Sequence, residues 1–279
     1  MYKIVDKKVL NSTVTRMDIE APLVARKAQP GQFIILRVDE NGERIPLTVA
    51  DYDREKGTVS IIFQIVGATT EKLNRLSAGD YIQDFVGPLG RATHTEGLKK
   101  VAVVGGGVGC AIAYPVAKKL HESGCEVHSI IGFRTKDLII LKDEFEANSS
   151  KLVLMTDDGS AGEKGLVTDA LKRLIESGEK YDEVITIGPL VMMKFVCRLT
   201  KEYGIKTIAS MNPIMIDGTG MCGGCRLTVD GKTVFACVDG PEFDGHKIDF
   251  DEAIARGSMY REFEREAHCR LMNGGKENA

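Results

Sequence analysis

Hydrophobic and polar positions alternate over short stretches in the first third of the chain. The alternation is clear in KIVDKKVL, in FIILRV after Gly31, and in TVSIIFQIV after Gly57. Short alternating segments separated by glycine turns are typical of antiparallel strands, and only residues 71–80 have the pattern of a short helix. Residues 1–97 are therefore predicted to form a small antiparallel β-barrel.

The pattern changes at Lys100. Four apolar segments, in KKVAVV, EVHSII, KLVLM and EVITI, are each followed by glycine within a few residues, and mostly helical patterns separate them. Apolar strands that alternate with helices indicate a parallel α/β sheet, which we assign to residues 98–208. Helices are expected over residues 111–123, 136–147, 166–176 and 191–203.

The last part of the chain differs in composition from the first two parts. Residues 209–250 are predicted to form a small separate lobe, because cysteines and glycines concentrate there. Residues 251–279 are predicted to form a charged C-terminal helix and a tail, with the helix extending over residues 250–269.

Composition narrows the function class. The 279 residues carry 37 basic and 40 acidic side chains, a formal charge of -3, without blocks of one sign. With this balance of charges, the sequence has no basic segment of the kind that binds nucleic acid or an anionic membrane. The N-terminus has no signal-peptide pattern, and the uncharged run over residues 101–117 contains glycines and a proline and is too short for a membrane span. We expect a cytoplasmic protein that binds neither nucleic acid nor membrane.

Four residues near the C-terminus have the spacing of metal ligands. Asp217, Cys222, Cys225 and Cys237 are arranged as D-x4-C-x2-C-x11-C, which is the plant-type [2Fe–2S] spacing with Asp in place of the first Cys. The glycines between them allow the backbone to turn closely around a cluster. The same cysteines also suit a zinc knuckle or a metal-free redox pair, and Asp217 also suits a simple turn.

The ends of the apolar strands predict a nucleotide site. Gly105, Gly106, Gly107 and Gly109 follow VAVV and precede a helix, where backbone amides can approach a pyrophosphate. Arg134, Asp157, Asp158 and Gly188 end the other strands at the same sheet edge, where ligands of α/β sheets bind. The aspartates suit the ribose of NAD(H) better than the 2′-phosphate of NADP(H), although they also suit the cap of a turn.

Several ordered motifs resemble one superfamily. RIPLT (44–48), FQIVGATT (63–70), GPLG (87–90) and GGGVGCA (105–111) precede the cysteine group. Together they resemble the ferredoxin–NADP reductase superfamily, and within it the electron-transfer subunits of class B dihydroorotate dehydrogenase and of sulfide dehydrogenase. Over nearly its whole length, the chain is similar to the family of small (alpha) subunits of NADH-dependent reduced ferredoxin:NADP oxidoreductases, which bifurcate electrons.

This resemblance implies an FAD-binding barrel. In the family, the arginine matched by Arg44 reaches the FAD pyrophosphate, and the hydroxyl residue matched by Thr48 lies beside the isoalloxazine, near N5. No side chain is then required as an acid or base, because the cofactors carry the reaction. The remaining residues that the family motifs assign to FAD are Pro46, Leu47, Phe63, Gln64, Ile65, Thr69, Thr70 and Gly87.

The resemblance also implies the reaction and the partner. Hydride would pass between NAD(H) and FAD, and single electrons between FAD and the [2Fe–2S] cluster. The second subunit would be a larger flavoprotein with its own FAD and [4Fe–4S] clusters, through which ferredoxin is reached indirectly. Dihydroorotate-type subunits have Cys where this chain has Asp217, which favours the bifurcating type. The alternatives are an electron-transfer subunit of dihydroorotate or sulfide dehydrogenase and, in another class, a non-enzymatic binding protein stapled by zinc.

Overall fold

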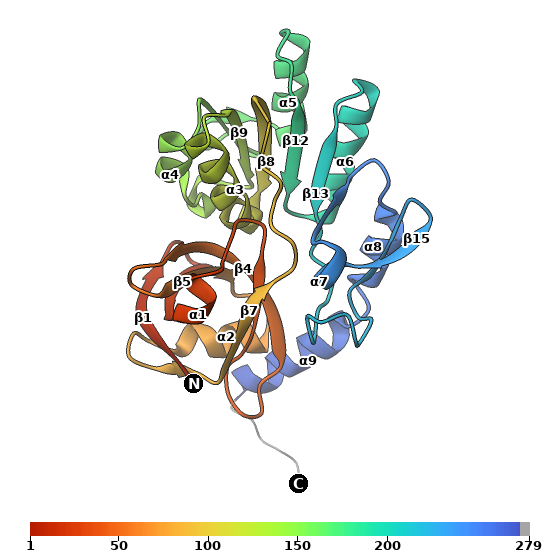
Figure 1. Ribbon diagram of the computed structural model, residues 1–279. Helices are drawn as coiled ribbons and strands as arrows, with labels where there is room; N and C mark the ends of the chain where they lie inside the picture. Colours follow the sequence, from red (N-terminus) through yellow and green to blue (C-terminus); the bar gives the residue numbers. More distant parts are fainter. Residues whose placement is uncertain (274–279) are drawn as a thin grey trace.

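The computed structural model describes residues 1–273 and begins with an antiparallel barrel (Figure 1). Its seven strands are hydrogen-bonded in the order β6-β1-β2-β5-β4-β3-β7, and the outer strands β6 and β7 are consecutive in the chain. Alternate side chains of these strands fill one buried apolar core, as period-two patterns require. The strands are β1 (Tyr2–Val9), β2 (Val14–Glu20), β3 (Phe33–Arg37), β4 (Arg44–Asp53), β5 (Thr58–Gln64), β6 (Tyr81–Ile82) and β7 (Asp84–Leu89).

Two short helices accompany the barrel, α1 (Pro22–Ala25) and α2 (Ala68–Arg75). The helix expected over residues 71–80 thus begins earlier and ends earlier. The Thr70 hydroxyl accepts hydrogen bonds from the backbone N–H groups of Val66 and Gly67, which fixes the start. The Lys7 ammonium binds the carbonyls of Asn74 and Leu76 at the other end, where a positive charge suits the helix dipole.

The second sheet is parallel except at one edge. Its order is β11-β10-β9-β8-β12-β13-β16, and only β16 runs antiparallel, beside β13. The sequence pattern did not identify β11, β13 or β16 as strands, and the boundary expected at residue 208 falls inside β13. The strands are β8 (Lys100–Gly106), β9 (Glu126–Phe133), β10 (Lys151–Thr156), β11 (Glu163–Lys164), β12 (Glu183–Ile187), β13 (Thr207–Ser210) and β16 (Glu242–Asp244).

Helices connect these parallel strands, and one predicted helix is broken. Residues 136–147 form only η2 (Lys136–Leu138) and α4 (Lys142–Ala147), because Leu141 is buried in a left-handed conformation with φ of 56°. The intervening Ile140 turns inward and is also buried. The other connections are η1 (Gly107–Gly109), α3 (Cys110–Glu122), α5 (Val167–Glu176) and α6 (Leu190–Glu202).

The C-terminal lobe consists of a small hairpin and short helices beside both larger parts (Figure 1). The helix predicted over residues 250–269 is interrupted between residues 257 and 260, where the chain turns. The predicted tail beyond residue 273 lies outside the described residues. The elements are β14 (Arg226–Val229), β15 (Lys232–Phe235), α7 (Ala236–Asp239), α8 (Phe250–Arg256) and α9 (Arg261–Met272).

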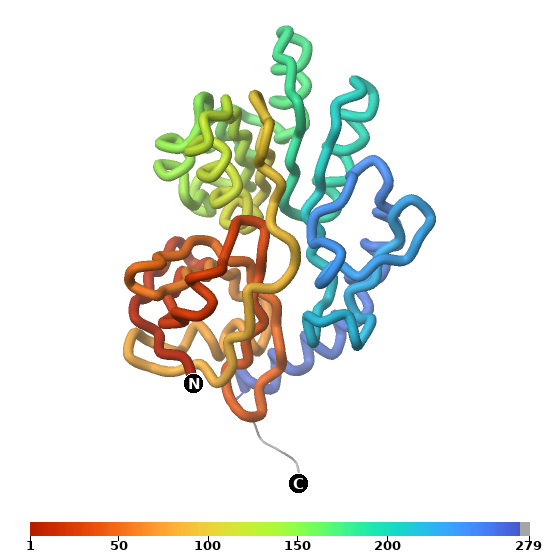
Figure 2. The backbone as a smooth tube through the Cα atoms, in the orientation of Figure 1, coloured from red at the N-terminus to blue at the C-terminus, as the bar shows by residue number. Residues whose placement is uncertain are grey.

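Hydrophobic cores cross the boundaries between the three parts. Val14, Ala50 and Ile62 of the barrel belong to the same buried cluster as Ala113 and Val116 of α3. A second cluster contains barrel side chains, side chains of α6, and two of the lobe's cysteines. Figure 2 shows the corresponding path, in which the chain leaves the second sheet and returns to the side of the barrel.

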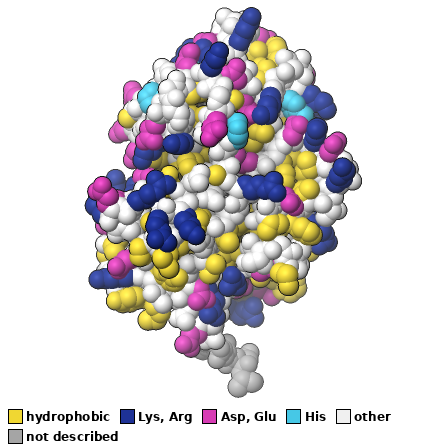
Figure 3. All heavy atoms as spheres, in the orientation of Figure 1, with side chains coloured by type: hydrophobic (Ala, Val, Ile, Leu, Met, Phe, Trp, Pro, Cys, Tyr) yellow, Lys and Arg dark blue, Asp and Glu magenta, His cyan; other side chains and the backbone are white. Residues whose placement is uncertain are grey.

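The surface carries charges of both signs. On the face shown in Figure 3, acidic and basic side chains are interspersed, with hydrophobic side chains between them. Within residues 1–273, no helix combines the length and the apolar character that crossing a membrane requires.

Candidate functional site

A cavity of about 1010 Å³ lies where the barrel, the second sheet and the C-terminal lobe meet. Its volume is at the upper end of the range for ligand sites, and its walls are mostly apolar. Of the residues predicted to bind cofactors, those that line it are Pro46, Leu47, Thr48, Phe63, Gln64, Thr70, Gly106, Gly107, Gly109, Arg134, Asp157 and Gly188.

The barrel wall is formed by two neighbouring strands and one helix. Pro46, Leu47 and Thr48 come from β4, and Phe63 and Gln64 come from the end of β5. Because β4 and β5 pair antiparallel, these two sets are brought together at one edge of the barrel. A wide, mostly apolar wall with the hydroxyl groups of Thr48 and Thr70 suits a flat aromatic ring system such as isoalloxazine.

Four predicted flavin residues lie outside the cavity lining. Arg44 is half-buried, and its Nε donates to the carbonyl of Ile216 at 2.8 Å. The Thr69 hydroxyl donates to Glu43 Oε2 at 3.0 Å. Ile65 packs against the barrel core, and Gly87 lies so close to Ile34 that a Cβ would be 2.5 Å from it. Their cofactor roles stay predictions.

Two glycine turns form the wall opposite the barrel. Gly109 and Gly188 meet backbone to backbone, since a Cβ on Gly109 would lie 2.6 Å from Gly188 Cα. Gly107 differs, because it has φ of +56° and nothing lies within 4 Å of the position of an added Cβ. This open concave backbone before α3 is the kind of surface that a pyrophosphate approaches. Gly105 packs behind it, against Cys110, and does not line the cavity.

The two aspartates after β10 have separate surroundings. Asp157 is exposed and lines the cavity together with Arg134. Asp158 instead accepts hydrogen bonds from the backbone N–H of Ser160 at 2.9 Å and from its hydroxyl at 2.6 Å. The Ser160 hydroxyl hydrogen bond, followed by the backbone hydrogen bond, lowers the pKa of Asp158. Only Asp157 is therefore free to meet a ligand in the cavity.

Sequence reasoning missed part of the lining. Asn11 lies in the turn between β1 and β2, and its Nδ2 donates to the Leu138 carbonyl at 3.1 Å, across the barrel boundary. The polar turn NST was the available signal for this contact. The end of β13 and the segment after it had no comparable signal, and they contribute Ser210, Met211, Asn212, Pro213 and Met215.

The predicted cluster ligands lie in one loop, residues 217–225, and in α7, the short helix that follows the hairpin. Cys222 is exposed, whereas Cys225 and Cys237 are buried. The backbone N–H of Gly224 points to Cys222 Sγ, and that of Cys237 to Cys225 Sγ, each at 3.4 Å. Amides aimed at sulfur, in a loop with several left-handed glycines, suit an iron–sulfur cluster.

Asp217 organises the same loop. Its Oδ1 accepts from the Thr219 N–H at 2.9 Å, and its Oδ2 accepts from the Cys222 N–H at 2.8 Å. These backbone hydrogen bonds, that from Thr219 first, lower the pKa of the carboxyl group. Both oxygens keep lone pairs beyond these bonds, so loop support and metal ligation are compatible.

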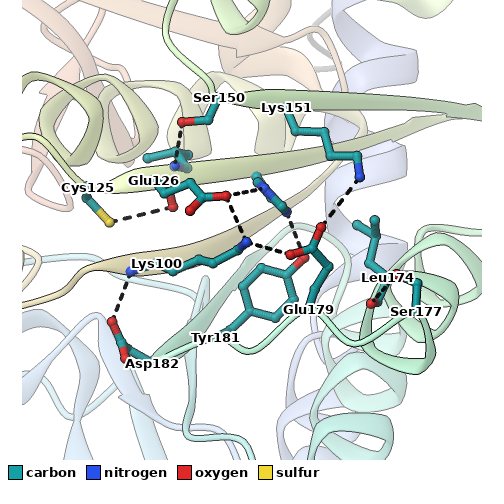
Figure 4. Close-up of polar contacts among 12 residues, drawn as sticks. Lys100, Cys125, Glu126, Ser150, Lys151, Leu174, Ser177, Glu179, Tyr181 and Asp182 are labelled. Carbon is teal, nitrogen blue, oxygen red and sulfur yellow. Dashed lines mark hydrogen bonds and ion pairs between the residues drawn. The ribbon is translucent and has the colours of Figure 1, made fainter.

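A second polar cluster lies at the amino ends of the parallel strands, away from the cavity at their carboxyl ends. Figure 4 shows its polar contacts. The ligand atoms of Glu126, His128 and Glu179 lie within 4.8 Å of one another. However, the Lys100 ammonium binds Glu126 Oε1 at 2.7 Å and Glu179 Oε2 at 2.5 Å. The lysine thus supplies the positive charge that a metal ion would supply, and this cluster is a structural ion network.

Comparisons with known proteins agree with this arrangement. Residues 103–198 match the family described as "Oxidoreductase NAD-binding domain", and residues 212–249 match the "Iron-sulfur cluster binding domain of dihydroorotate dehydrogenase B". These ranges contain the glycine turns and the cysteine loop.

Three similar proteins cover nearly the whole chain. A Clostridium beijerinckii protein, "Uncharacterized protein in adh 3'region", is 53% identical over 98% of this chain and 95% of its own length. A Thermotoga maritima protein, "Dihydroorotate dehydrogenase B (NAD(+)), electron transfer subunit homolog", is 46% identical over 100% of this chain and 98% of its own length. A chain from the structure of NADH-dependent reduced ferredoxin-NADP oxidoreductase, solved for insights into flavin-based electron bifurcation, is 45% identical, with a TM-score of 0.93 over 98% of each chain.

These matches confirm the predicted fold class, the oxidoreductase assignment and the cofactors, namely an iron–sulfur cluster, NAD(H) and FAD. They favour the cluster over a zinc knuckle for the cysteine loop. The chain therefore belongs to the family of dihydroorotate dehydrogenase B electron-transfer subunit homologues, oxidoreductase subunits that join a ferredoxin–NADP reductase-type fold to an iron–sulfur lobe.

Proposed function

We propose that this chain is the small electron-transfer subunit of an NADH-dependent reduced ferredoxin:NADP oxidoreductase. The observation that carries the proposal is the single cavity shared by the flavin wall, the nucleotide turns and the lobe that contains the cysteines. FAD held there would supply the conversion between two-electron exchange with NAD(H) and one-electron exchange with a [2Fe–2S] cluster. The similarity to a subunit of the bifurcating enzyme over 98% of both chains supports the same assignment.

The residues have binding and orienting roles. Leu47 and Phe63 would present apolar surface to the flavin ring, and the Thr48 hydroxyl would be available to its N5. The amides around Gly107 hold the nucleotide pyrophosphate, and Asp157 accepts hydrogen bonds from the ribose of NAD(H). Asp217, Cys222, Cys225 and Cys237 hold the cluster. Apolar side chains around the mouth, such as Phe195, limit access of water.

We propose the ranges 1–97, 98–208, 209–250 and 251–279 as the functional units of the chain. The partner in this proposal is a larger flavoprotein with a second FAD and [4Fe–4S] clusters, which receives electrons from NADPH and delivers them to NAD and ferredoxin. No disulfide joins any of the cysteines of residues 1–273, and we propose a cytoplasmic location.

Cofactor analysis tests the subunit itself. The purified chain should contain one FAD and one [2Fe–2S] cluster, and it should reduce an artificial acceptor faster with NADH than with NADPH. Visible absorption separates this outcome from a zinc protein, which is colourless. A chain that contains zinc and neither flavin nor sulfide would contradict the proposal.

Identification of the partner tests the complex. A tagged chain should co-purify with a large flavoprotein, and the complex should reduce ferredoxin with NADPH only when NAD is present. The alternative of a dihydroorotate or sulfide dehydrogenase subunit predicts a different partner and a reaction that needs dihydroorotate or sulfide.

A further inference from the structure

The loop that carries Asp217 is seated on the barrel. Gly218 is buried with φ of +78°, and an added Cβ would lie 2.7 Å from Leu89 Cδ1 and 2.8 Å from Ile35 Cδ1. The left-handed φ favours glycine here, and a side chain would overlap the side chains of Ile35 on β3 and Leu89 on β7. The position of the cluster loop is therefore defined against the same barrel that forms the flavin wall.

Two barrel-side arginines reach the lobe at different places. Arg44 Nε donates to the Ile216 carbonyl at 2.8 Å, directly before Asp217. Arg91 Nε donates to the Val238 carbonyl at 3.2 Å, directly after Cys237, and its guanidinium lies 3.7 Å from Asp239. The two arginines thus contact the backbone next to the first and the last of the predicted cluster ligands.

Only Arg44 belongs to the flavin side. Its neighbours Ile45 and Pro46 line the cavity, and Glu43 accepts from the Thr69 hydroxyl at the start of α2. Among the described residues, the bond from Nε is the one hydrogen bond of the Arg44 side chain, so its two Nη groups keep their donors. A guanidinium can bind a carbonyl through Nε and a phosphate through its Nη groups at the same time, whereas an ammonium has no such fork.

We propose that Arg44 is a positioning residue that couples FAD occupancy to the order of the cluster loop. This inference rests on the proposed function and on the role that the family resemblance implies for Arg44, contact with the FAD pyrophosphate. A phosphate held by the Nη groups fixes the guanidinium, and the fixed Nε then holds the Ile216 carbonyl more firmly. Binding of the flavin thereby stabilises the backbone that presents Asp217 and Cys222.

Hydrogen–deuterium exchange of the cluster-containing protein tests this coupling. The reporters are the backbone N–H groups of Thr219 and Cys222, both bonded to Asp217. Saturating FAD should slow exchange in residues 216–225 of the wild type by roughly three- to tenfold, the range expected for one hydrogen bond. Arg44→Lys, saturated with FAD, should lose this slowing, because its ammonium cannot bind both groups in the same geometry.

Arg91→Ala is the matched control. It removes a bond of the same kind on the far side of the cluster, so the slowing by FAD should persist even if basal exchange rises. If Arg44→Lys keeps the slowing, or Arg91→Ala abolishes it, the coupling through Arg44 is refuted. A wild type that binds FAD without slower exchange also refutes it and leaves the proposed function intact. A wild type that does not bind FAD refutes the proposed function itself.

Discussion

The consecutive residues Asp157 and Asp158 differ in what their carboxylates contact. Sequence reasoning assigned both to the nucleotide, because a strand end predicts where a residue lies but not which way it points. In the structure, Asp157 lines the cavity and Asp158 is bonded to Ser160. The direction of each aspartate side chain depends on the tight turn that follows. Gly159 and Ser160 form this turn, and Ser160 binds the Asp158 carboxylate.

Nucleotide preference should therefore depend on Asp157 alone. Asp157→Asn removes a negative charge that repels a 2′-phosphate, and the ratio of kcat/KM for NADH to that for NADPH should fall about tenfold, equivalent to ~1.4 kcal/mol. Steady-state rates with an artificial acceptor measure the ratio. Asp158→Asn is the control, since it weakens the turn without changing the charge in the cavity, and an equal fall in that variant would contradict the assignment.

Asp217 supports the loop backbone, as its alternative assignment to a turn predicted, and this role is compatible with metal ligation. We expect Asp217→Cys to keep a [2Fe–2S] cluster with an altered potential and visible spectrum, because a thiolate replaces a harder oxygen ligand. Asp217→Asn preserves one acceptor for the loop amides but is a poor iron ligand, so iron and acid-labile sulfide should fall. If Asp217 only supports the loop, Asn should retain wild-type iron and the wild-type EPR spectrum of the reduced protein.

At the scale of elements, long periodic segments were predicted well and short or interrupted ones were not. The helices expected over 111–123, 166–176 and 191–203 occur within one residue of their predicted bounds. The segment over 136–147 has helical spacing but breaks at Leu141, since burial of Ile140 and Leu141 in the tertiary structure outweighs local propensity. The edge strand β16 depends on β13 for its hydrogen bonds, a long-range contact that local patterns do not contain.

The ion network of Lys100, Glu126, His128 and Glu179 joins β8, β9 and the segment before β12. A substitution of Lys100 tests its contribution to stability. Hydrogen bonds to Glu126 and then to Glu179 raise the pKa of Lys100, so the ammonium is charged throughout the neutral range. Lys100→Ala removes the cation shared by Glu126 and Glu179 and leaves Glu179 with Lys151 at 3.7 Å, so the unfolding free energy should fall.

The same variant should acquire a response to zinc. Without the ammonium, Glu126, His128 and Glu179 are close enough to bind one ion, and Zn²⁺ should raise the melting temperature of Lys100→Ala more than that of the wild type. Adding His128→Gln should abolish the difference. Equal responses of the wild type and Lys100→Ala would show that the lysine does not occupy a cation position.

At the scale of the whole molecule, Glu242 of β16 is a half-buried carboxyl group where the second sheet meets the barrel. It accepts from the Thr93 hydroxyl at 2.7 Å, and its Oε1 lies beside Gly31. Burial, followed by the charge of Glu183, raises the pKa of Glu242 to about 7, while the Thr93 hydrogen bond opposes the rise. The folded protein therefore binds a proton there at pH values where the unfolded chain, near pKa 4.5, has released it.

This difference predicts how stability changes with pH. The contribution of Glu242 is greatest below about pH 4.5 and falls as the pH rises to about 7, by up to about 3 kcal/mol. Glu242→Gln stays neutral, so its unfolding free energy relative to the wild type should increase over this interval and then level off. Denaturant unfolding at several pH values measures the difference, and a constant difference would contradict the raised pKa.

The three cysteines predicted to bind the cluster differ in exposure, and this difference determines which of them is oxidised first. Cys222 is open to solvent, while Cys225 and Cys237 are enclosed by the lobe. Peroxide reaching an exposed sulfur converts it to sulfenic and then to sulfinic acid, and the second step is not reversed by ordinary thiols. Oxidation of the isolated subunit should thus begin at Cys222 Sγ, and loss of iron should follow. A protein surface that covers Cys222 in an assembled enzyme would protect its sulfur from oxidation.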